Sequence, residues 1–334
     1  KSENLPDAIQ DERIISILRD QLMLGKELPT GGYEDTCIWP SRRSFRNGLF
    51  IYETGKGEIV EENGDYQLVF VSPFCTKNRY KPAPNRIICS GNLSLEAQEL
   101  LMKLSAAYLL ISEKYQVSIM EKKQAILRKE FTAAFVESYL ETGIIEIGNE
   151  KKTIKSLISK EFKNFDELFS EIKPTLLQPY FEATYPKHPR FTQLISRDTI
   201  EGEFSGAIKD LINRNSVQSL FGSSKAILAA LDLIDQNDLL NTAQSEVAQN
   251  ILQEARELNG KNLDVEKIVS KYEQSPYGYH PLMSAFVIVV LTYNGEIALK
   301  AAGGKTISSS EVAEIFGKGL EAFGNIKYLF IESE

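Results

Sequence analysis

Apolar side chains recur every three to four residues along much of the chain, which is the spacing of an amphipathic helix. The pattern is clearest in residues 94–112, which begin with a suitable N-cap serine, and in residues 117–142, which end at Gly143. The expected buried positions of these two helices are Leu101, Leu104, Tyr108, Ile111, Leu127, Phe131, Phe135 and Tyr139. Further helices are predicted over residues 6–24, 165–183, 204–213, 223–235, 244–258, 265–272 and 281–293.

Strand-like runs of β-branched and aromatic residues occur in two places, each punctuated by glycine. Near the N-terminus they cover residues 49–52, 58–60 and 66–71, which we interpret as a small antiparallel sheet. Near the C-terminus, residues 295–300 and 305–308 form a predicted hairpin around two glycines, followed by a helix over 309–323 and a strand over 328–331. Two helices followed by a hairpin are the order of a winged helix.

These elements predict an α+β fold that is mainly α, with a small N-terminal antiparallel sheet and a C-terminal winged-helix-like unit. A chain of 334 residues is long enough for two or three packed units. The proline-rich residues 185–191 mark a joint between them. We therefore predict three domains: residues 1–92 with the first helix and the sheet, a helical domain over 93–192, and residues 193–334 ending in the winged-helix-like unit.

Composition points to a globular protein of a reducing compartment. Hydrophobic residues make up 43% and charged residues 25%, and the formal net charge is −8. The three cysteines are widely spaced and the two histidines are far apart, which excludes a paired-cysteine zinc motif and a histidine-rich metal site. The sequence begins without the apolar region of a signal peptide, so we expect a cytoplasmic protein with no membrane partner.

Several short motifs resemble sites of chemistry but lack an essential part. The Gly-Gly-Lys-Thr run at 303–306 resembles the end of a phosphate-binding loop, but Leu299 stands where its first glycine belongs. His188 and His280 each precede a proline, and neither lies in a known nucleophile motif. The aspartates at 232, 235 and 238 lack the glycine and terminal glutamate of a calcium loop. We therefore predict no catalytic, cofactor-binding or metal-binding residue in this chain.

The most distinctive polar feature is a long segment over residues 26–48 without a clear period, which we interpret as a loop. It carries an aromatic residue close to three arginines, and a second basic stretch follows at 77–86. The candidate contact residues for a partner protein or a nucleic acid are Trp39, Arg42, Arg43, Arg46, Lys77, Arg79, Lys81 and Arg86. The opposing interpretation, which we favour, is a solvated loop whose arginines pair with nearby carboxylates.

The winged-helix-like part does not have the charge of a DNA-binding module. From Gly202 to Glu334 the sequence has 11 Lys and Arg against 17 Asp and Glu, and the predicted helix over 281–293 carries no basic residue. We expect this unit to be structural or to contact protein.

Five stretches together resemble a known family. Residues 64–74, 106–108, 185–191, 276–279 and 295–299 are similar to a region downstream of the nucleotide-binding part of large P-loop ATPases from phage-exclusion (BREX) islands, the BrxC/PglY group. None of these stretches is a catalytic signature, and the Walker motifs of that family have no counterpart here.

The resemblance implies a segment beyond the ATPase core, with ATP and Mg²⁺ expected only for the parent protein. The leading hypothesis is a non-catalytic interaction and coupling segment of a phage-defence ATPase, whose partners are other domains of the parent and defence-system proteins. The alternatives are a nucleic-acid-binding module that uses the basic residues and, third, an enzyme whose site the sequence does not reveal.

Overall fold

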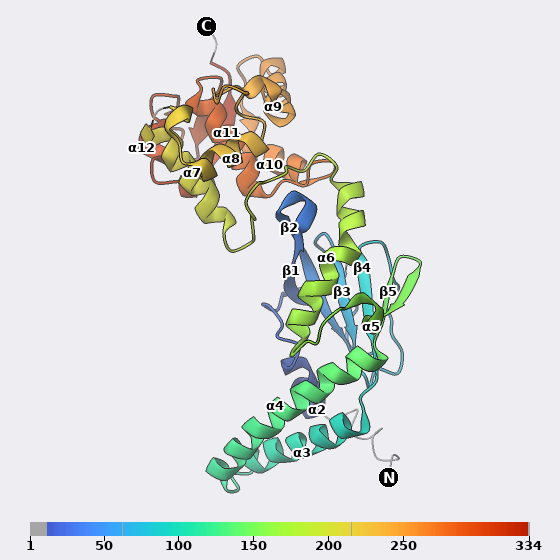
Figure 1. Cartoon of the computed structure of the whole chain (residues 1–334). Coiled ribbons are helices and arrows are strands. Elements are labelled where there is room, and N and C mark those ends of the chain that lie inside the picture. Colours follow the sequence, from blue (N-terminus) through green and yellow to red (C-terminus); the bar gives the residue numbers. More distant parts are fainter. Residues whose placement is uncertain (1–11, 62, 215, 333–334) are drawn as a thin grey trace. The chain divides into compact units, whose positions relative to one another are not determined.

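The computed structural model describes residues 12–61, 63–214 and 216–332, and its chain divides into two compact units (Figure 1). Unit 1 comprises Lys1–Ile38 and Arg46–Tyr180, and unit 2 comprises Trp39–Phe45 and Phe181–Glu334. The chain therefore contributes to unit 2 twice, first with the seven residues Trp39–Phe45 and then with all residues from Phe181 onward. The boundary predicted at residue 92 falls inside unit 1, and the one predicted at residue 192 falls inside unit 2.

Unit 1 contains one sheet, and its helices come before, between and after the strands in the sequence. The predicted first helix begins outside the described residues, and its described part is α2 (Glu12–Asp20). The remaining elements are β1 (Tyr33–Trp39), β2 (Ser44–Glu53), β3 (Gln67–Val71), β4 (Arg86–Ser90), α3 (Leu95–Ser112), α4 (Val117–Thr142), β5 (Ile144–Ile147), β6 (Glu150–Thr153), α5 (Ile154–Leu157) and α6 (Phe165–Thr184). The short 3₁₀ turn η1 (Pro40–Arg42), between β1 and β2, belongs to unit 2. The division between the units falls within β1, β2 and α6.

The sheet has the strand order β1-β2-β3-β4-β5-β6 and is mixed. β3 is parallel to both β2 and β4, whereas β4, β5 and β6 pair antiparallel. The prediction of a small antiparallel sheet is therefore wrong. Connections over residues 54–66 and 72–85 are long enough for parallel crossovers, and the predicted strand at 58–60 lies within the first of them.

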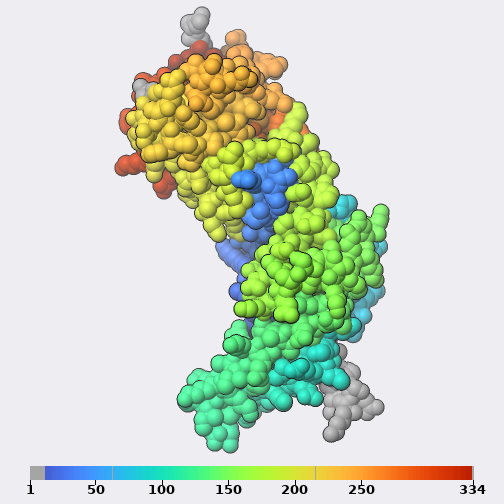
Figure 2. Space-filling model, in the orientation of Figure 1, coloured from blue at the N-terminus to red at the C-terminus, as the bar shows by residue number. Residues whose placement is uncertain are grey.

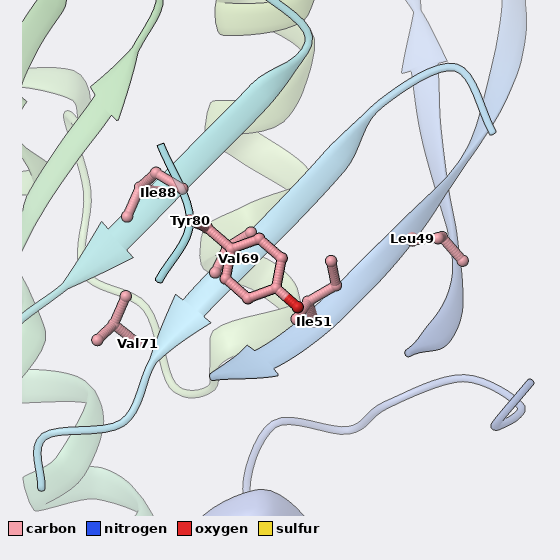
Figure 3. Packing of buried hydrophobic residues seen from close by; sticks show 6 residues of the cluster. All are labelled: Leu49, Ile51, Val69, Val71, Tyr80 and Ile88. Atoms are coloured by element: carbon pink, nitrogen blue, oxygen red, sulfur yellow. The ribbon is translucent and has the colours of Figure 1, made fainter. Parts of the chain in front are cut away.

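Both faces of this sheet are covered by apolar side chains, because successive residues of a strand point to opposite faces. On one face, Phe70 of β3 stacks on Tyr139 of α4 with ring centroids 4.8 Å apart, and Phe165 of α6 meets Phe70 edge-on. On the other face lies the cluster of Leu49, Ile51, Val69, Val71, Tyr80 and Ile88 (Figure 3). Tyr80 accepts a hydrogen bond from the Val60 amide, 2.8 Å away, so the crossover segment covers this second face.

Helices α3 and α4 form an antiparallel hairpin whose tip extends away from the sheet (Figures 1 and 2). The predicted bounds of both helices are confirmed: Ser94 caps α3 through the Ala97 amide, and Gly143 is the C-cap of α4. The predicted stripe of α4 faces the core, with Leu127, Phe131, Phe135 and Tyr139 all buried.

Unit 2 is helical with one small antiparallel sheet in the order β7-β10-β8-β9. Its elements are α7 (Ile200–Arg214), η2 (Val217–Ser219), α8 (Gly222–Ala230), η3 (Thr242–Gln244), α9 (Glu246–Glu257), β7 (Leu263–Asp264), α10 (Val265–Glu273), α11 (Pro281–Tyr293), β8 (Ala298–Ala301), β9 (Thr306–Ile307), α12 (Val312–Phe316), η4 (Glu321–Asn325) and β10 (Ile326–Phe330).

The order α9-β7-α10-α11-β8-β10 is that of a winged helix, with β10 pairing between β7 and β8. The wing is enlarged by β9, α12 and η4. The helix predicted over 309–323 is split here because α12 ends at Gly317, and Gly319 has a φ of +119°. The predicted mainly helical α+β class with a winged-helix-like unit is thus confirmed.

Helix α11 occupies the position of a recognition helix but is a core element. Every residue from Met283 to Thr292 is buried, and α7, α9, α10 and α12 pack around it. A helix enclosed in this way cannot enter a DNA groove without unfolding the unit. Within the described residues, no helix is both long and apolar enough to span a bilayer.

Candidate functional site

The segment over residues 26–48 is not the loop that the sequence predicts. It contains β1 and the start of β2, joined by the short 3₁₀ turn η1. The first four residues of β1 are all half-buried, so the strand lacks the alternation that reveals a strand in the sequence.

The turn at residues 39–45 is fixed within unit 2 by backbone hydrogen bonds. Phe191 donates its amide to the Arg42 carbonyl at 3.0 Å, and Ile195 donates to the Arg43 carbonyl at 2.9 Å. Arg43 itself adopts a left-handed conformation with a φ of 48°. The proline-rich joint around residue 188 is therefore the partner of this turn.

Trp39 is completely buried in unit 2. Its ring stacks on the His188 imidazole with centroids 5.0 Å apart, and its indole Nε1 donates to Glu182 Oε1 at 3.1 Å. The expectation that Trp39 anchors a partner from the surface is wrong, because the indole is already enclosed by the chain's own residues.

Arg42 is also buried and has its donors occupied. It donates to Glu182 Oε2 at 2.8 Å, to the Pro186 carbonyl at 3.1 Å, and to the His188 carbonyl. The same carboxylate accepts from Ser41 Oγ. Hydrogen bonds from Arg42 are the main reason that the pKa of Glu182 falls from 4.5 to about 2. Arg42 and Glu182 therefore form a charged support for the Trp39 pocket.

His188 and Ser44 have the relative geometry of a serine–histidine pair. Ser44 Oγ lies 2.9 Å from Nε2 of His188, and the Tyr277 carbonyl lies 3.0 Å from Nδ1. A carbonyl only accepts, so Nδ1 carries a hydrogen, and in a neutral imidazole Nε2 accepts from the serine. Ser44 has no exposed surface and His188 only 3%, so a substrate cannot reach the hydroxyl. The pair holds two chain segments together, and no local sequence pattern connects them because 144 residues separate them along the chain.

The other arginines of the predicted site do not join this cluster. Arg43 is exposed and donates to the Thr192 carbonyl in unit 2. Arg46 belongs to unit 1, where it is buried and pairs with Asp65 at 3.0 Å. Of these two arginines, only the exposed Arg43 is accessible to an external partner.

The second basic stretch is also partly committed to structure. Arg79 makes a bidentate ion pair with the buried Glu53: Nε lies 2.7 Å from Oε1 and Nη2 lies 2.8 Å from Oε2. Arg86 donates to Gln67 at 2.6 Å and stacks over Tyr80. Lys77 and Lys81 are exposed.

Unit 1 contains a buried polar cluster that the sequence did not indicate. Lys173 of α6 donates to Asp35 Oδ2 at 2.7 Å and to the Thr36 carbonyl at 2.9 Å, and Tyr66 donates to the same carboxylate at 2.6 Å. Burial raises the pKa of the neighbouring Cys37 thiol to about 12, which leaves it protonated and a poor nucleophile.

A groove of about 950 Å³ on unit 2 runs between α10, the start of α11, η4 and β10. Its charged lining is one lysine, Lys327, and the acidic residues Glu201, Asp264, Glu266, Glu273 and Glu321. Such a lining repels a phosphate backbone. The Gly-Gly-Lys-Thr run lies elsewhere, in the β8–β9 hairpin, where Gly304 donates to the Ala301 carbonyl and has a φ of +82°.

The most accessible apolar surface of unit 1 lies on the α3–α4 hairpin. On α3 the exposed fractions are 79% for Leu95, 49% for Met102 and 38% for Leu109, and on α4 they are 59% for Ile119 and 60% for Ile126. Large apolar side chains gathered on one exposed element are typical of protein contacts. We define these five residues and the charged residues between them as the hairpin surface.

The fold and these contacts define a helix-rich α+β protein with an elaborated winged-helix unit. Residues 1–185 match the DUF6079 third domain, and residues 200–331 match the fourth domain of the same family of unknown function. The chain belongs to the DUF6079 family. No curated protein and no solved structure matched it.

Proposed function

We propose that this chain is a non-catalytic interaction and coupling segment of a larger phage-defence ATPase of the BREX type. The observation that carries this proposal is the hairpin surface, where large apolar side chains are exposed together on a projecting element. Two clusters contain residue types that occur in catalytic sites, one at His188 and one at Lys173. Both are by contrast buried and hydrogen-bonded within the chain. Nucleotide and Mg²⁺ are assigned to the parent protein and not to this chain.

The three cysteines Cys37, Cys75 and Cys89 are free thiols, which supports a cytoplasmic location in a reducing environment. The partners in this proposal are other domains of the parent and proteins of the defence system.

The reading frame upstream of Lys1 tests the ATPase assignment directly. We expect it to encode a G-x-x-x-x-G-K-[ST] phosphate loop followed by an apolar strand ending in an acidic pair. A complete frame without these motifs contradicts the assignment. Thermal unfolding of the chain with and without Mg-ATP tests the non-catalytic part, and a nucleotide-dependent rise in melting temperature contradicts it.

A nucleic-acid role has less support. The guanidinium groups of Arg42, Arg46 and Arg79 are engaged with carboxylates, and the groove of unit 2 is acidic. A gel shift at low salt that is lost in Arg43→Ala/Lys77→Ala/Lys81→Ala would favour the nucleic-acid alternative.

A further inference from the structure

The groove of unit 2 between α10, the start of α11, η4 and β10 contains apolar surface that the chain itself does not cover. The apolar and aromatic side chains that line it and are only partly buried are Val269, Leu282, Phe323 and Tyr328. Tyr328 is 40% exposed. The volume of about 950 Å³ lies at the upper end of the range for ligand pockets, so the groove has room for several side chains of a partner.

Carboxylates from three different elements line the same groove. The exposed Glu201 comes from α7, Glu266 from α10 and Glu321 from η4. Within residues 12–61, 63–214 and 216–332, no ion pair involves any of these three glutamates. The lining has one basic residue, Lys327 of β10. We call this site the acidic groove, because its unpaired charge is mainly negative.

The other charged residues nearby do not reverse this balance. Asp264 and Glu273 also line the groove, but Asp264 caps α10 by accepting from the Glu266 amide at 2.9 Å, and Glu273 has an interaction within the chain. The lysines of α10, Lys267 and Lys271, do not belong to the lining, and Lys271 pairs with Glu254 of α9. Three unpaired carboxylates therefore face one ammonium group.

Helix dipoles offset only part of this negative charge. Glu201 and Glu266 lie in the first turns of α7 and α10, where the positive end of the dipole stabilises a carboxylate. That end is equivalent to about half an elementary charge, so a negative charge remains at both positions. Glu321 lies in the first turn of η4, whose five residues form a smaller dipole. Apolar surface framed by such charges is complementary to a partner that carries positive charges beside an apolar side chain.

We propose that the acidic groove binds a basic segment of another protein region, in which lysines or arginines flank a large apolar side chain. The cations pair with Glu201, Glu266 and Glu321, and the apolar side chain covers the exposed surface of Tyr328 and its apolar neighbours. This proposal rests on the proposed role as an interaction segment and states the chemistry of one partner. It places that partner on unit 2, in addition to any contact made by the hairpin surface.

The test selects peptides from a phage-displayed library of random dodecapeptides on the whole 334-residue chain. We expect the enriched sequences to carry a net positive charge and at least one large apolar residue. A synthetic peptide of the most enriched sequence is then titrated by fluorescence anisotropy. Glu201→Gln/Glu266→Gln/Glu321→Gln should weaken its binding by about tenfold or more, and so should Tyr328→Ala. Lys327→Gln should tighten it by about threefold, because it removes the like charge.

Matched controls separate the groove from the overall charge of the chain. Glu113→Gln/Glu121→Gln/Glu130→Gln removes the same number of charges from exposed positions of the α3–α4 hairpin, and it should bind the peptide like the unmodified chain. Thermal unfolding checks that each variant is folded, and the single variants Glu266→Gln and Glu321→Gln replace a triple variant that is not. Tighter binding by Lys327→Gln is informative in either case, because loss of structure does not strengthen binding.

Several outcomes overturn the proposal. Selection that enriches no basic sequences, or equal binding of the peptide by the triple groove variant, shows that the groove is not its site. Spermidine is titrated alone by calorimetry, and if it binds as tightly as the peptide while Tyr328→Ala has no effect, the groove is a polyamine site. An upstream ATPase region that binds the chain although no basic peptide is selected contradicts this inference and leaves the proposed function standing. A parent without a phosphate loop contradicts the proposed function, whereas peptide binding in the groove still supports this inference.

Discussion

Lys173 Nζ lies 2.7 Å from Asp35 Oδ2 in unit 1, and the side chains are only 7% and 18% exposed. The same oxygen accepts a hydrogen bond from Tyr66. Removing the ammonium group leaves a mostly buried carboxylate with one donor fewer, and the Thr36 carbonyl loses its side-chain donor.

We therefore expect Lys173→Met to lower the free energy of unfolding of unit 1 by about 3–5 kcal/mol. Lys160→Met is the matched control, because that lysine pairs with Glu171 while 62% exposed, and its loss should cost about 1 kcal/mol or less. Hydrogen exchange of peptides from β2 and β3 in urea measures both. Equal effects of the two substitutions would show that burial of the Lys173 pair is not important.

Gly48 of β2 lies against the ring of Tyr66. A Cβ at residue 48 would be 2.5 Å from the Tyr66 ring carbons, and Tyr66 is fully buried. Gly48→Ala should destabilise unit 1 by about 1–3 kcal/mol, since the ring has no free space to enter. Gly206→Ala in α7 is the contrasting change, because a Cβ there meets nothing within 4 Å, and it should stabilise unit 2 by about 0.5–1 kcal/mol. Thermal unfolding that moves in the same direction for both would contradict these assignments.

The pKa of Glu182 implies a specific acid sensitivity of unit 2. Because the folded-state pKa is lowered from 4.5 to about 2, the carboxylate stabilises the fold fully above pH 4.5. That stabilisation is lost as the pH falls through the interval from 4.5 to about 2. The difference in unfolding free energy between the unmodified chain and Glu182→Gln should therefore shrink on acidification across this interval. A difference that is independent of pH would refute the ion pair with Arg42.

Trp39 is the one tryptophan of the chain, so its fluorescence reports on unit 2. Because the indole is fully buried, its emission should be blue-shifted and resistant to acrylamide until unit 2 unfolds. Trp39→Ala should cost about 3–5 kcal/mol. Trp39→Phe keeps a ring to stack on His188 but loses the hydrogen bond to Glu182, so it should cost less than the alanine substitution. Strong quenching of the folded protein would contradict the enclosed position.

Local sequence patterns were sufficient where a helix is marked by its own residues. The bounds of α4 follow from its apolar spacing, those of α11 from its nearly continuous apolar run, and the Ser94 cap of α3 from the residue type. They failed where the deciding contact is distant in sequence. Val60 is β-branched, as strand residues often are, yet it lies over Tyr80 in the crossover between β2 and β3. Whether two neighbouring strands run parallel depends on the path of the connection between them and not on the residue types in that connection.

The candidate site shows the same limit. The sequence pattern of an aromatic residue followed by arginines is the same whether these side chains are exposed or buried. Trp39 and Arg42 are enclosed by Glu182 and His188, which lie more than a hundred residues later in the chain. The signal that was available is the proline-rich joint itself, since residues 185–191 provide the carbonyl groups and the imidazole that the turn requires.

The position of Trp39 also has a consequence for synthesis on the ribosome. Its hydrogen-bond partner Glu182 is 143 residues further along the chain. At about 5–20 residues per second, roughly 7–30 s pass before that partner is made. During this interval the indole has no native pocket, although the strands on either side of the turn are complete. Nascent chains of this protein should therefore present a tryptophan to chaperones until the second unit emerges.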